Sequence, residues 1–359
     1  MSGIMGMLGI SDTDRAFVGT SGQAAAYDAI TEIVARHNAL IDGMLSTFVE
    51  RTTTDFKIRY KLPGGGRLQR LRTDAPSAAV KRYGSYDVAF PLEGFGAQIA
   101  GSRVNMAYMT GIELDTHIDS VLIQNANTVR YEVLDALLSD DQDTFVDPLH
   151  GSLSIEPLAN GDTVTYPPVL GSESEATEDH YLATSYAATA ISDTNDPYNT
   201  IKLDLTHHFG DNVGGENIVV FIHPDEEPET TDMSDFDAVE DRFIRSGDNT
   251  DVPFGLPNVP GMIIGRVSGV WVAQWRWIPS GYMLAVHLDA PKPLYKRVDP
   301  ADTGLPQGLS LVQTDERYPI ESSYWEHRFG FGCANRLNGV AMYVSGDSTW
   351  AEPSGYTGA

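Results

Sequence analysis

The histidines come nearest to a chemical site in this sequence. His207 and His208 are adjacent, and His223 stands in the run His-Pro-Asp-Glu beside two carboxyl groups. Imidazole and carboxylate are common metal ligands. Adjacent residues do not share a face of a helix or strand, so a joint site for the pair requires a loop. A solvated loop is the better interpretation of both segments, and a metal-dependent hydrolase stays an alternative.

The patterns of the common enzyme classes are missing from the sequence. It has no Walker loop, no Gly-x-Ser-x-Gly, no His-Glu-x-x-His and no EF-hand loop. The glycine pairs at 94–96 and 330–332 begin like a dinucleotide fingerprint, but the sixth position is Ile99 or Asn335. Cys333, the single cysteine, lies in an apolar segment and is predicted to be a buried structural thiol. We therefore predict no enzyme, no metal and no cofactor.

The charge is unevenly distributed along the chain. The 359 residues include 50 acids and 24 bases, a formal net charge of −26. Residues 51–82 oppose this excess with nine bases and two acids, whereas residues 173–251 hold twenty acids and three bases. Separated opposite charges favour attraction between copies of one chain. A strongly acidic body repels phosphate, so general binding to nucleic acid is not expected.

The basic segment has the pattern of a β-hairpin. Apolar and basic side chains alternate along it: Phe56, Ile58, Tyr60 and Leu62 against Lys57, Arg59 and Lys61. This alternation predicts a strand with one apolar and one basic face. The Pro-Gly-Gly-Gly run at 63–66 ends the strand, and a return limb is expected over 67–74. A two-stranded ribbon is marginal alone in water, so the hairpin 51–74 should lie on another surface.

Three interpretations of this hairpin remain open. It docks on an acidic patch of another copy, it binds nucleic acid through residues 51–82, or it is a solvated loop. The acidic remainder of the chain favours docking. The predicted intersubunit residues are Arg51, Phe56, Lys57, Ile58, Arg59, Tyr60, Lys61, Arg67, Arg70 and Arg72.

Hydrophobic periodicity predicts the elements that position the hairpin. Helices are expected over 23–45, 113–139, 176–190, 197–210 and 238–246. The helix over 113–139 is predicted most firmly, because neither glycine nor proline occurs between Ile112 and Asp147. The apolar run 218–222 is predicted to be a buried strand, followed by an acidic loop at 223–237. Further strands are expected within 261–289 and at 324–331 and 340–344.

The order of these parts resembles the major capsid proteins of tailed double-stranded DNA phages, of the Hong Kong 97 type. The segments that carry the resemblance are the hairpin around PGGG, the long helix, IVVFIHPDE at 218–226, GRVSGVWVAQWRWIPSGYMLAVHLDAP at 265–291 and ESSYWEHRFGFGCANRLNGVAMYV at 321–344. It implies an α+β fold with an N-terminal arm, an extended hairpin called the E-loop, a peripheral (P) domain with a long spine helix, and an axial (A) domain. The implied boundaries are 1–46 for the arm, 47–95 for the E-loop, 96–170 for the P domain, 171–294 for the A domain, 295–345 for the returning P-domain strands and 346–359 for a tail. The segment 321–344 would be the closing pair of P-domain strands.

The resemblance also implies the function. The chain would assemble through pentamers and hexamers into an icosahedral shell around double-stranded DNA, without sequence-specific DNA contact. Separate scaffolding, portal and decoration proteins are possible partners, and a membrane is not. The expected location is the virion capsid, assembled in the host cytoplasm. An encapsulin-like compartment is an alternative, and no crosslink is predicted for Lys57 or Lys61.

Overall fold

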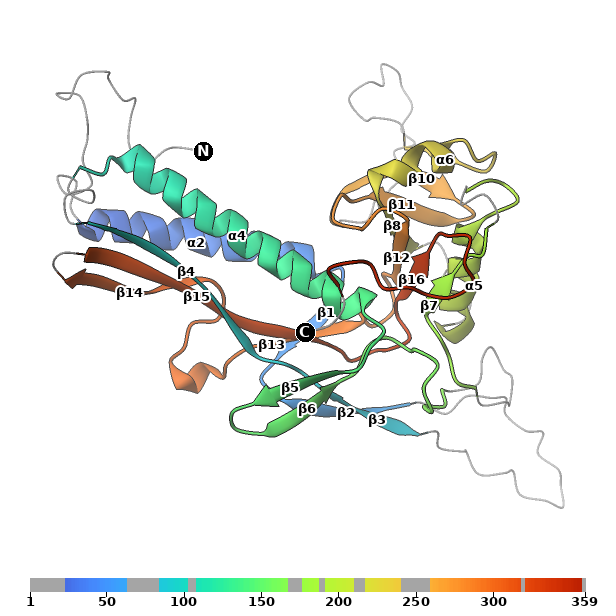
Figure 1. Cartoon of the computed structure of the whole chain (residues 1–359), viewed down its shortest axis with the longest axis horizontal. Helices are drawn as coiled ribbons and strands as arrows, with labels where there is room; N and C mark the ends of the chain where they lie inside the picture. Colours follow the sequence, from blue (N-terminus) through green and yellow to red (C-terminus); the bar gives the residue numbers. More distant parts are fainter. Residues whose placement is uncertain are drawn as a thin grey trace, which may run out of the picture. The chain divides into compact units, whose positions relative to one another are not determined.

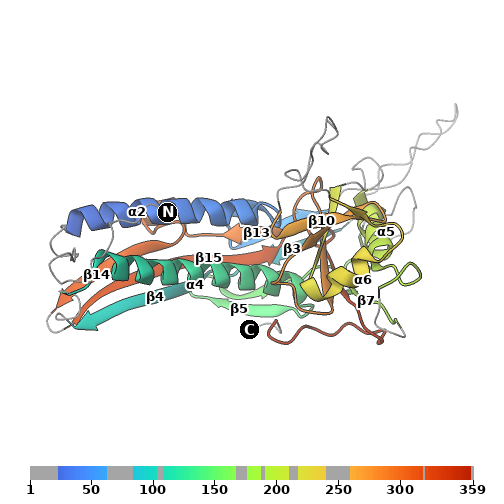
Figure 2. The same cartoon turned by 90° about the horizontal axis from the view of Figure 1, so that it is seen from above.

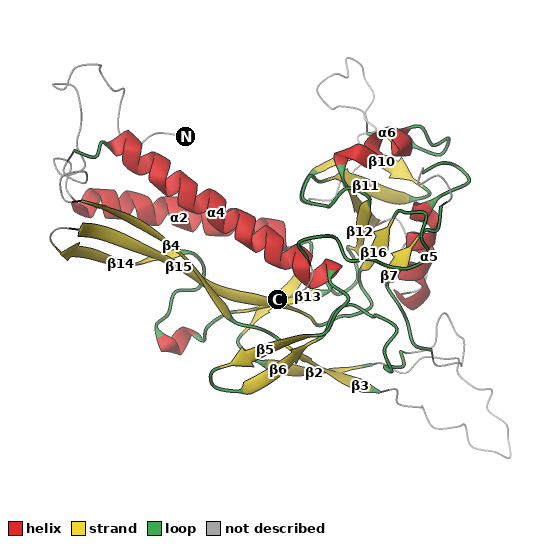
Figure 3. Ribbon diagram, in the orientation of Figure 1, coloured by secondary structure: helices red, strands yellow, loops and turns green. Residues whose placement is uncertain are grey.

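The computed structural model describes residues 23–62, 84–102, 108–166, 176–186, 191–209, 217–239, 259–317 and 320–356. The chain forms two compact units, one of residues 1–45, 92–132 and 297–330 and one of residues 46–91, 133–296 and 331–359. Both contain sheet, and helices and strands are mixed throughout (Figure 3). This mixture confirms the predicted α+β class. The boundaries expected for arm, E-loop, P domain and A domain stay a prediction.

The first unit contains two long helices, α2 (Gln23–Leu45) and α4 (Gly111–Leu138), which confirm the predictions over 23–45 and 113–139. A capping box begins α4. The Thr110 amide donates to Glu113 Oε2 at 2.8 Å, and the Glu113 amide donates to Thr110 Oγ1 at 3.4 Å. Two backbone donors that the helix leaves without partners are thereby satisfied.

Long strands run alongside these helices (Figure 1, Figure 2). β15 (Ile320–Cys333) pairs antiparallel with β4 (Glu93–Ser102) and with β14 (Ser310–Arg317). The sheet also includes β13 (Leu294–Arg297) and β1 (Val49–Thr53). Trp325 of β15 packs in one buried cluster with residues of both helices, among them Ile30 and Ile118. The helices are therefore held by the apolar face of the strands.

The second unit is built on a seven-stranded sheet. Its order is β7 (Tyr181–Ala183), β16 (Val340–Tyr343), β12 (Tyr282–His287), β8 (Ile218–Ile222), β11 (Val270–Gln274), β10 (Met262–Val267) and β9 (Asp237–Ala238). The central strand β8 pairs parallel with β11 and antiparallel with β12, and all five of its residues are buried. The predicted buried strand is confirmed.

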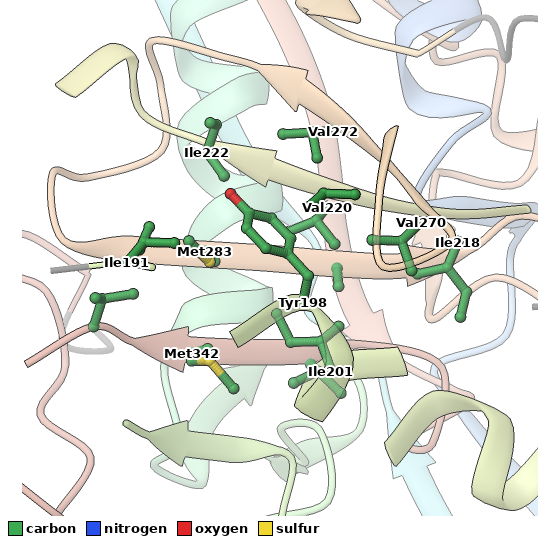
Figure 4. Close-up of a cluster of buried hydrophobic side chains, with 14 of the residues drawn as sticks. Ile191, Tyr198, Ile201, Ile218, Val220, Ile222, Val270, Val272, Met283 and Met342 are labelled. Atoms are coloured by element: carbon green, nitrogen blue, oxygen red, sulfur yellow. The ribbon is translucent and has the colours of Figure 1, made fainter. Parts of the chain in front are cut away.

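Both faces of β8 are covered, which explains its unbroken apolar run. On one face, Tyr198 and Ile201 of α5 (Pro197–Phe209) pack with Val220 in a single cluster (Figure 4). On the other face the Phe221 ring lies 5.3 Å from Phe48 and 5.7 Å from Trp275. The helix predicted over 197–210 is confirmed as α5.

Two predictions about this unit are wrong. The helix expected over 176–190 is replaced, in its described part, by strand β7, because residues 181–183 complete the ladder beside β16. The segments 324–331 and 340–344 are strands but not a closing pair, because β15 and β16 belong to different sheets. Residues 240–246 of the helix expected over 238–246 lie outside the described residues, and Asp237–Ala238 is strand β9.

Smaller elements complete the described structure. β2 (Lys57–Lys61) pairs with β3 (Ser85–Ala89), and β5 (Asp143–Asp147) pairs with β6 (Gly151–Ile155). The acidic segment expected to be a loop at 223–237 instead contains the short helices η5 (Pro224–Glu226) and α6 (Glu227–Thr231). A further short helix, η6, spans Ala301–Thr303.

Candidate intersubunit interface

The strand predicted from the alternating pattern is β2, but its partner differs from the prediction. β2 pairs with β3, from Lys57 opposite Ala89 to Lys61 opposite Ser85. The return limb expected over 67–74 lies outside the described residues, as do Arg67, Arg70 and Arg72. β1 does not belong to the β2–β3 pair and joins the sheet of β13. The described hairpin is therefore wider than 51–74, and its base is formed by residues 57–61 and 85–89.

One face of β2 carries three exposed cations: Lys57, Arg59 and Lys61. A single carboxylate, Asp87, lies opposite the middle cation. Arg59 Nε donates to Asp87 Oδ1 at 2.6 Å and its Nη2 donates to Oδ2 at 3.1 Å, while Lys57 Nζ lies 3.1 Å from Oδ2. Hydrogen bonds from Arg59 and then Lys57 hold the pKa of Asp87 well below its usual value. This basic face of β2 therefore keeps a net positive charge, and Lys61 lies at its end.

The apolar face of the hairpin base packs within its own chain. Ile58 and Tyr60 contact a buried cluster that includes Leu62, Tyr86, Val88, Phe90, Ala159, Tyr166, Ala334 and Leu337. The Tyr60 and Tyr86 rings lie 5.3 Å apart. Ile58 and Tyr60 are therefore partly covered by their own unit, and their contact with a neighbouring copy stays a prediction. For the basic side chains the intersubunit role stays a prediction.

The two remaining predicted interface residues also contact their own unit. The Phe56 ring stacks on the His150 ring at a centroid distance of 3.8 Å, beside the turn between β5 and β6. The Arg51 guanidinium lies 4.6 Å from the centre of the Tyr295 ring. Arg51 is exposed despite this contact. The guanidinium is therefore oriented by an aromatic ring rather than by a carboxylate.

Arg336 anchors the hairpin base, and sequence reasoning missed it. Its side chain is 1% exposed. It donates to the carbonyls of Pro157 at 2.7 Å and Leu158 at 3.0 Å, and to Asp162 Oδ2 at 2.6 Å. Beside it, the Tyr86 hydroxyl of β3 donates to the Ala334 carbonyl at 2.9 Å. The only signal in the sequence is one arginine within an otherwise apolar and amide-rich turn.

A close backbone approach holds the same region. A Cβ atom at Gly332 would lie 2.7 Å from the Ala89 carbonyl oxygen and 2.6 Å from Phe90 Cδ1. The end of β15 can therefore approach the end of β3 only because residue 332 has no side chain. The second glycine pair of the sequence serves packing at this position.

The described side chains of the histidine candidates do not assemble into a metal site. His223 Nδ1 accepts from the Asp225 amide at 3.2 Å, so it caps the short helix η5. His207 lies on α5, and the side chain of His208 is outside the described residues. Within the described ranges no group of three metal-ligating side chains is close enough to hold an ion.

Two further observations bear on other classes of site. Cys333 is buried, as predicted, and burial raises the pKa of its thiol to about 12, which makes it a poor nucleophile. Among the described helices none has the length and apolar character to cross a membrane.

The acidic segment 223–237 has an internal structural role. Its carboxylates accept hydrogen bonds from neighbouring backbone: Glu226 from the Gly281 amide at 2.6 Å, Glu229 from the Ile191 amide at 2.9 Å, and Asp235 from the Ser268 amide at 3.0 Å. Charge-assisted bonds of this kind fix the segment on the sheet. The segment therefore has a structural role in addition to its negative charge.

Comparison with known proteins identifies the fold. No family model and no curated protein matches the sequence. A solved chain of Mycobacterium phage Patience matches with a TM-score of 0.67 and 17% identity, over 98% of this chain and 97% of that chain. A chain from the capsid of a native GTA particle matches with a TM-score of 0.47 and 12% identity, over 84% and 89%. The capsid of the cyanophage P-SCSP1u matches with a TM-score of 0.45 and 11% identity, over 83% of this chain and 86% of that chain.

The match to the Patience chain covers nearly the whole of both chains. Because only 17% of the residues are identical, this match shows a shared backbone path. It says nothing about the side chains of the candidate interface. This chain therefore shares the fold of that chain of Mycobacterium phage Patience.

Proposed function

We propose that this chain is the major structural protein of a phage capsid. In this role it assembles through pentamers and hexamers into an icosahedral shell that encloses double-stranded DNA. The observation that carries the proposal is the match of 98% of the chain to a phage protein with a TM-score of 0.67. The main partners are other copies of the chain, and scaffolding, portal and decoration proteins are further partners. The location is the virion capsid, after assembly in the host cytoplasm.

The basic face of β2 supplies the contact between copies. Lys57, Arg59 and Lys61 project from a strand whose other face is packed on its own chain, so their backbone is ordered before the partner arrives. Such preorganisation lowers the entropic cost of association. The net charge of −26 gives a second copy an excess of carboxylates. Opposite charges then provide orientation and a fast association rate.

Asp87 argues against nucleic acid as the ligand of this face. It forms ion pairs with both Lys57 and Arg59, so a phosphate would have to compete with a carboxylate already in place. A docked protein surface can contact Lys61 and the exposed parts of Lys57 and Arg59 without displacing Asp87. Counterion release from DNA would be correspondingly small.

Electron microscopy of the expressed chain tests the proposal. We expect closed shells, or rings of five and six copies, at low to moderate ionic strength. The nucleic acid content of purified shells separates two classes of container, because a compartment for protein cargo would enclose none. A chain that stays monomeric at high concentration in every salt tested would contradict the shell.

A further inference from the structure

Two asparagines of the chain are followed directly by glycine, Asn160 before Gly161 and Asn338 before Gly339. In such a pair the backbone nitrogen of the glycine can attack the side-chain carbonyl carbon of the asparagine, because glycine has no side chain to block the approach. The new C–N bond closes a succinimide ring. The side-chain nitrogen leaves as ammonia, with the proton that the glycine nitrogen gives up. Water then opens the ring to aspartate or isoaspartate, so the reaction needs no enzyme and no cofactor.

The folded chain holds the Asn338 side chain in a position that opposes this reaction. Asn338 is 0% exposed. Its Nδ2 atom donates to the His287 carbonyl at 3.0 Å and to the Pro291 carbonyl at 2.8 Å, while its Oδ1 atom accepts from the His287 amide at 2.9 Å. Rotation of the side chain toward its own backbone would break these three hydrogen bonds inside the core. Burial also keeps away the water that opens the ring.

The glycine of the same pair is fixed as well. The Gly339 carbonyl lies 2.6 Å from His180 Nδ1, and a Cβ atom at Gly339 would lie 3.0 Å from Leu158 Cδ2. The residues that hold Asn338 and Gly339 are thus far away in the sequence, although they belong to the same compact unit. The protection therefore depends on tertiary structure and is absent from the unfolded chain.

The second pair offers a comparison within the same molecule. Asn160 is half-buried. Its Nδ2 atom donates to the Asp140 carbonyl at 2.9 Å, and its Oδ1 atom accepts from Arg336 Nη2 at 3.2 Å. The Gly161 amide donates to the Glu178 carbonyl at 2.8 Å. This pair is also held by the fold, but with fewer bonds to the side chain and less burial.

The same reaction product has different consequences at the two positions. An ionised aspartate accepts hydrogen bonds and donates none. At position 338 one carboxylate oxygen would face the His287 and Pro291 carbonyls, so two hydrogen bonds would become contacts between acceptors around a buried charge. At position 160 the carboxylate would still accept from Arg336, and only one hydrogen bond is lost.

We propose that Asn338–Gly339 is a spontaneous deamidation site that folding closes, and that its product prevents the chain from regaining the native core. In the unfolded chain Asn338 reacts with the Gly339 nitrogen and is converted to an acid. In the folded chain the bonds to His287 and Pro291 preserve the amide. Time spent unfolded thereby becomes irreversible damage, whereas the folded chain keeps its asparagine.

Incubation of the full-length chain at alkaline pH, with and without urea, tests the first part. Peptide mass spectrometry measures the conversion of each asparagine. We expect Asn338 to react in urea and to react more than about a hundredfold more slowly without urea, because only rare opening of the core exposes it. Asn160 should show weaker protection. Asn335 lies in the same turn but precedes Arg336, so it is the internal control and should stay largely unmodified in urea. Equal rates at Asn338 with and without urea, or no reaction there in urea, would overturn the proposal.

The variants N338D and N160D test the second part, since each replaces one asparagine by the product aspartate and changes the net charge equally. Urea denaturation followed by circular dichroism measures the unfolding equilibrium constant. We expect this constant to rise at least about a hundredfold in N338D and less than about tenfold in N160D. A chain that fails to fold with N338D, while N160D folds, gives the same support. Equal stability of the two variants would refute the block to refolding. Both measurements concern one chain, so their outcome is separate from that of the shell experiment.

Discussion

Arg336 lies fully buried with its Nη1 atom 2.6 Å from Asp162 Oδ2, and this ion pair joins the turn after β15 to the loop after β6. The same guanidinium also binds the Pro157 and Leu158 carbonyls and stands 5.8 Å from the Tyr86 ring of β3. One side chain thus connects the core of the second unit with the hairpin that carries the candidate interface.

Replacement of this arginine should therefore be costly. In Arg336→Leu, two buried carbonyls and a carboxylate lose their donor, and we expect a loss of about 3 kcal/mol in the free energy of unfolding. Arg336→Lys keeps the charge but not the planar fork, so an intermediate loss is expected. Urea denaturation followed by circular dichroism measures both. The exposed Arg276→Leu is the control and should stay within about 0.5 kcal/mol of the wild type.

Gly332→Ala should destabilise the chain by about 1–3 kcal/mol, because the new methyl group would overlap the Ala89 carbonyl and the Phe90 ring. Gly43→Ala is the opposite case. Gly43 lies in α2, and a Cβ atom added there would meet nothing within 4 Å, so alanine should stabilise by about 0.5–1 kcal/mol through helix propensity. Thermal unfolding of the two variants should shift in opposite directions. An unchanged midpoint for Gly332→Ala would refute the close approach.

Lys61→Glu should impair assembly without unfolding the chain. Lys61 is exposed at the end of the basic face, and its charge reversal leaves the ion pairs of Asp87 intact. We expect fewer shells in electron micrographs and a sedimentation profile shifted toward small species, most strongly at low salt because screening weakens charge effects at high salt. Arg276→Glu changes the net charge equally from another exposed site and should assemble normally. Equal behaviour of the two variants would remove the basic face from the interface.

Asp204→Asn should stabilise the second unit at alkaline pH. Burial, and then the charges of Glu178 and Asp179, raise the pKa of Asp204 to about 6. Because the pKa of Asp204 is raised in the folded chain, the free energy of unfolding falls as pH rises through about 6. Asparagine does not ionise, so the variant does not lose this stability. We expect a gain of about 1–2 kcal/mol at pH 8, allowing for the exposed part of the side chain, and little change at pH 4. A gain that is the same at both pH values would contradict this assignment.

The sequence predicts local structure best where one periodicity extends over many residues. The helices α2 and α4 and the buried strand β8 follow from their apolar spacing alone. The prediction failed at 176–190, where a three-residue strand forms because a neighbouring strand supplies its hydrogen bonds. It also failed for β15 and β16, which are close in the sequence but belong to different sheets.

The candidate interface was predictable in composition but not in geometry. Alternation along residues 56–62 defines a basic and an apolar face, yet it does not say which surface covers the apolar one. Contacts of high sequence separation decide that point, such as the bond from Tyr86 to Ala334. The partner of β2 was assigned to the nearest basic segment, whereas the observed partner begins at Ser85.

The central position of β8 has a consequence for synthesis of the chain. Its five apolar residues pair with β11 and β12, and the nearest of these partners begins at Val270, about fifty residues later. At a translation rate of about 5–20 residues per second, the nascent chain leaves this aggregation-prone run uncovered for several seconds. Until Val270 has been synthesised, neither pairing partner of this strand exists.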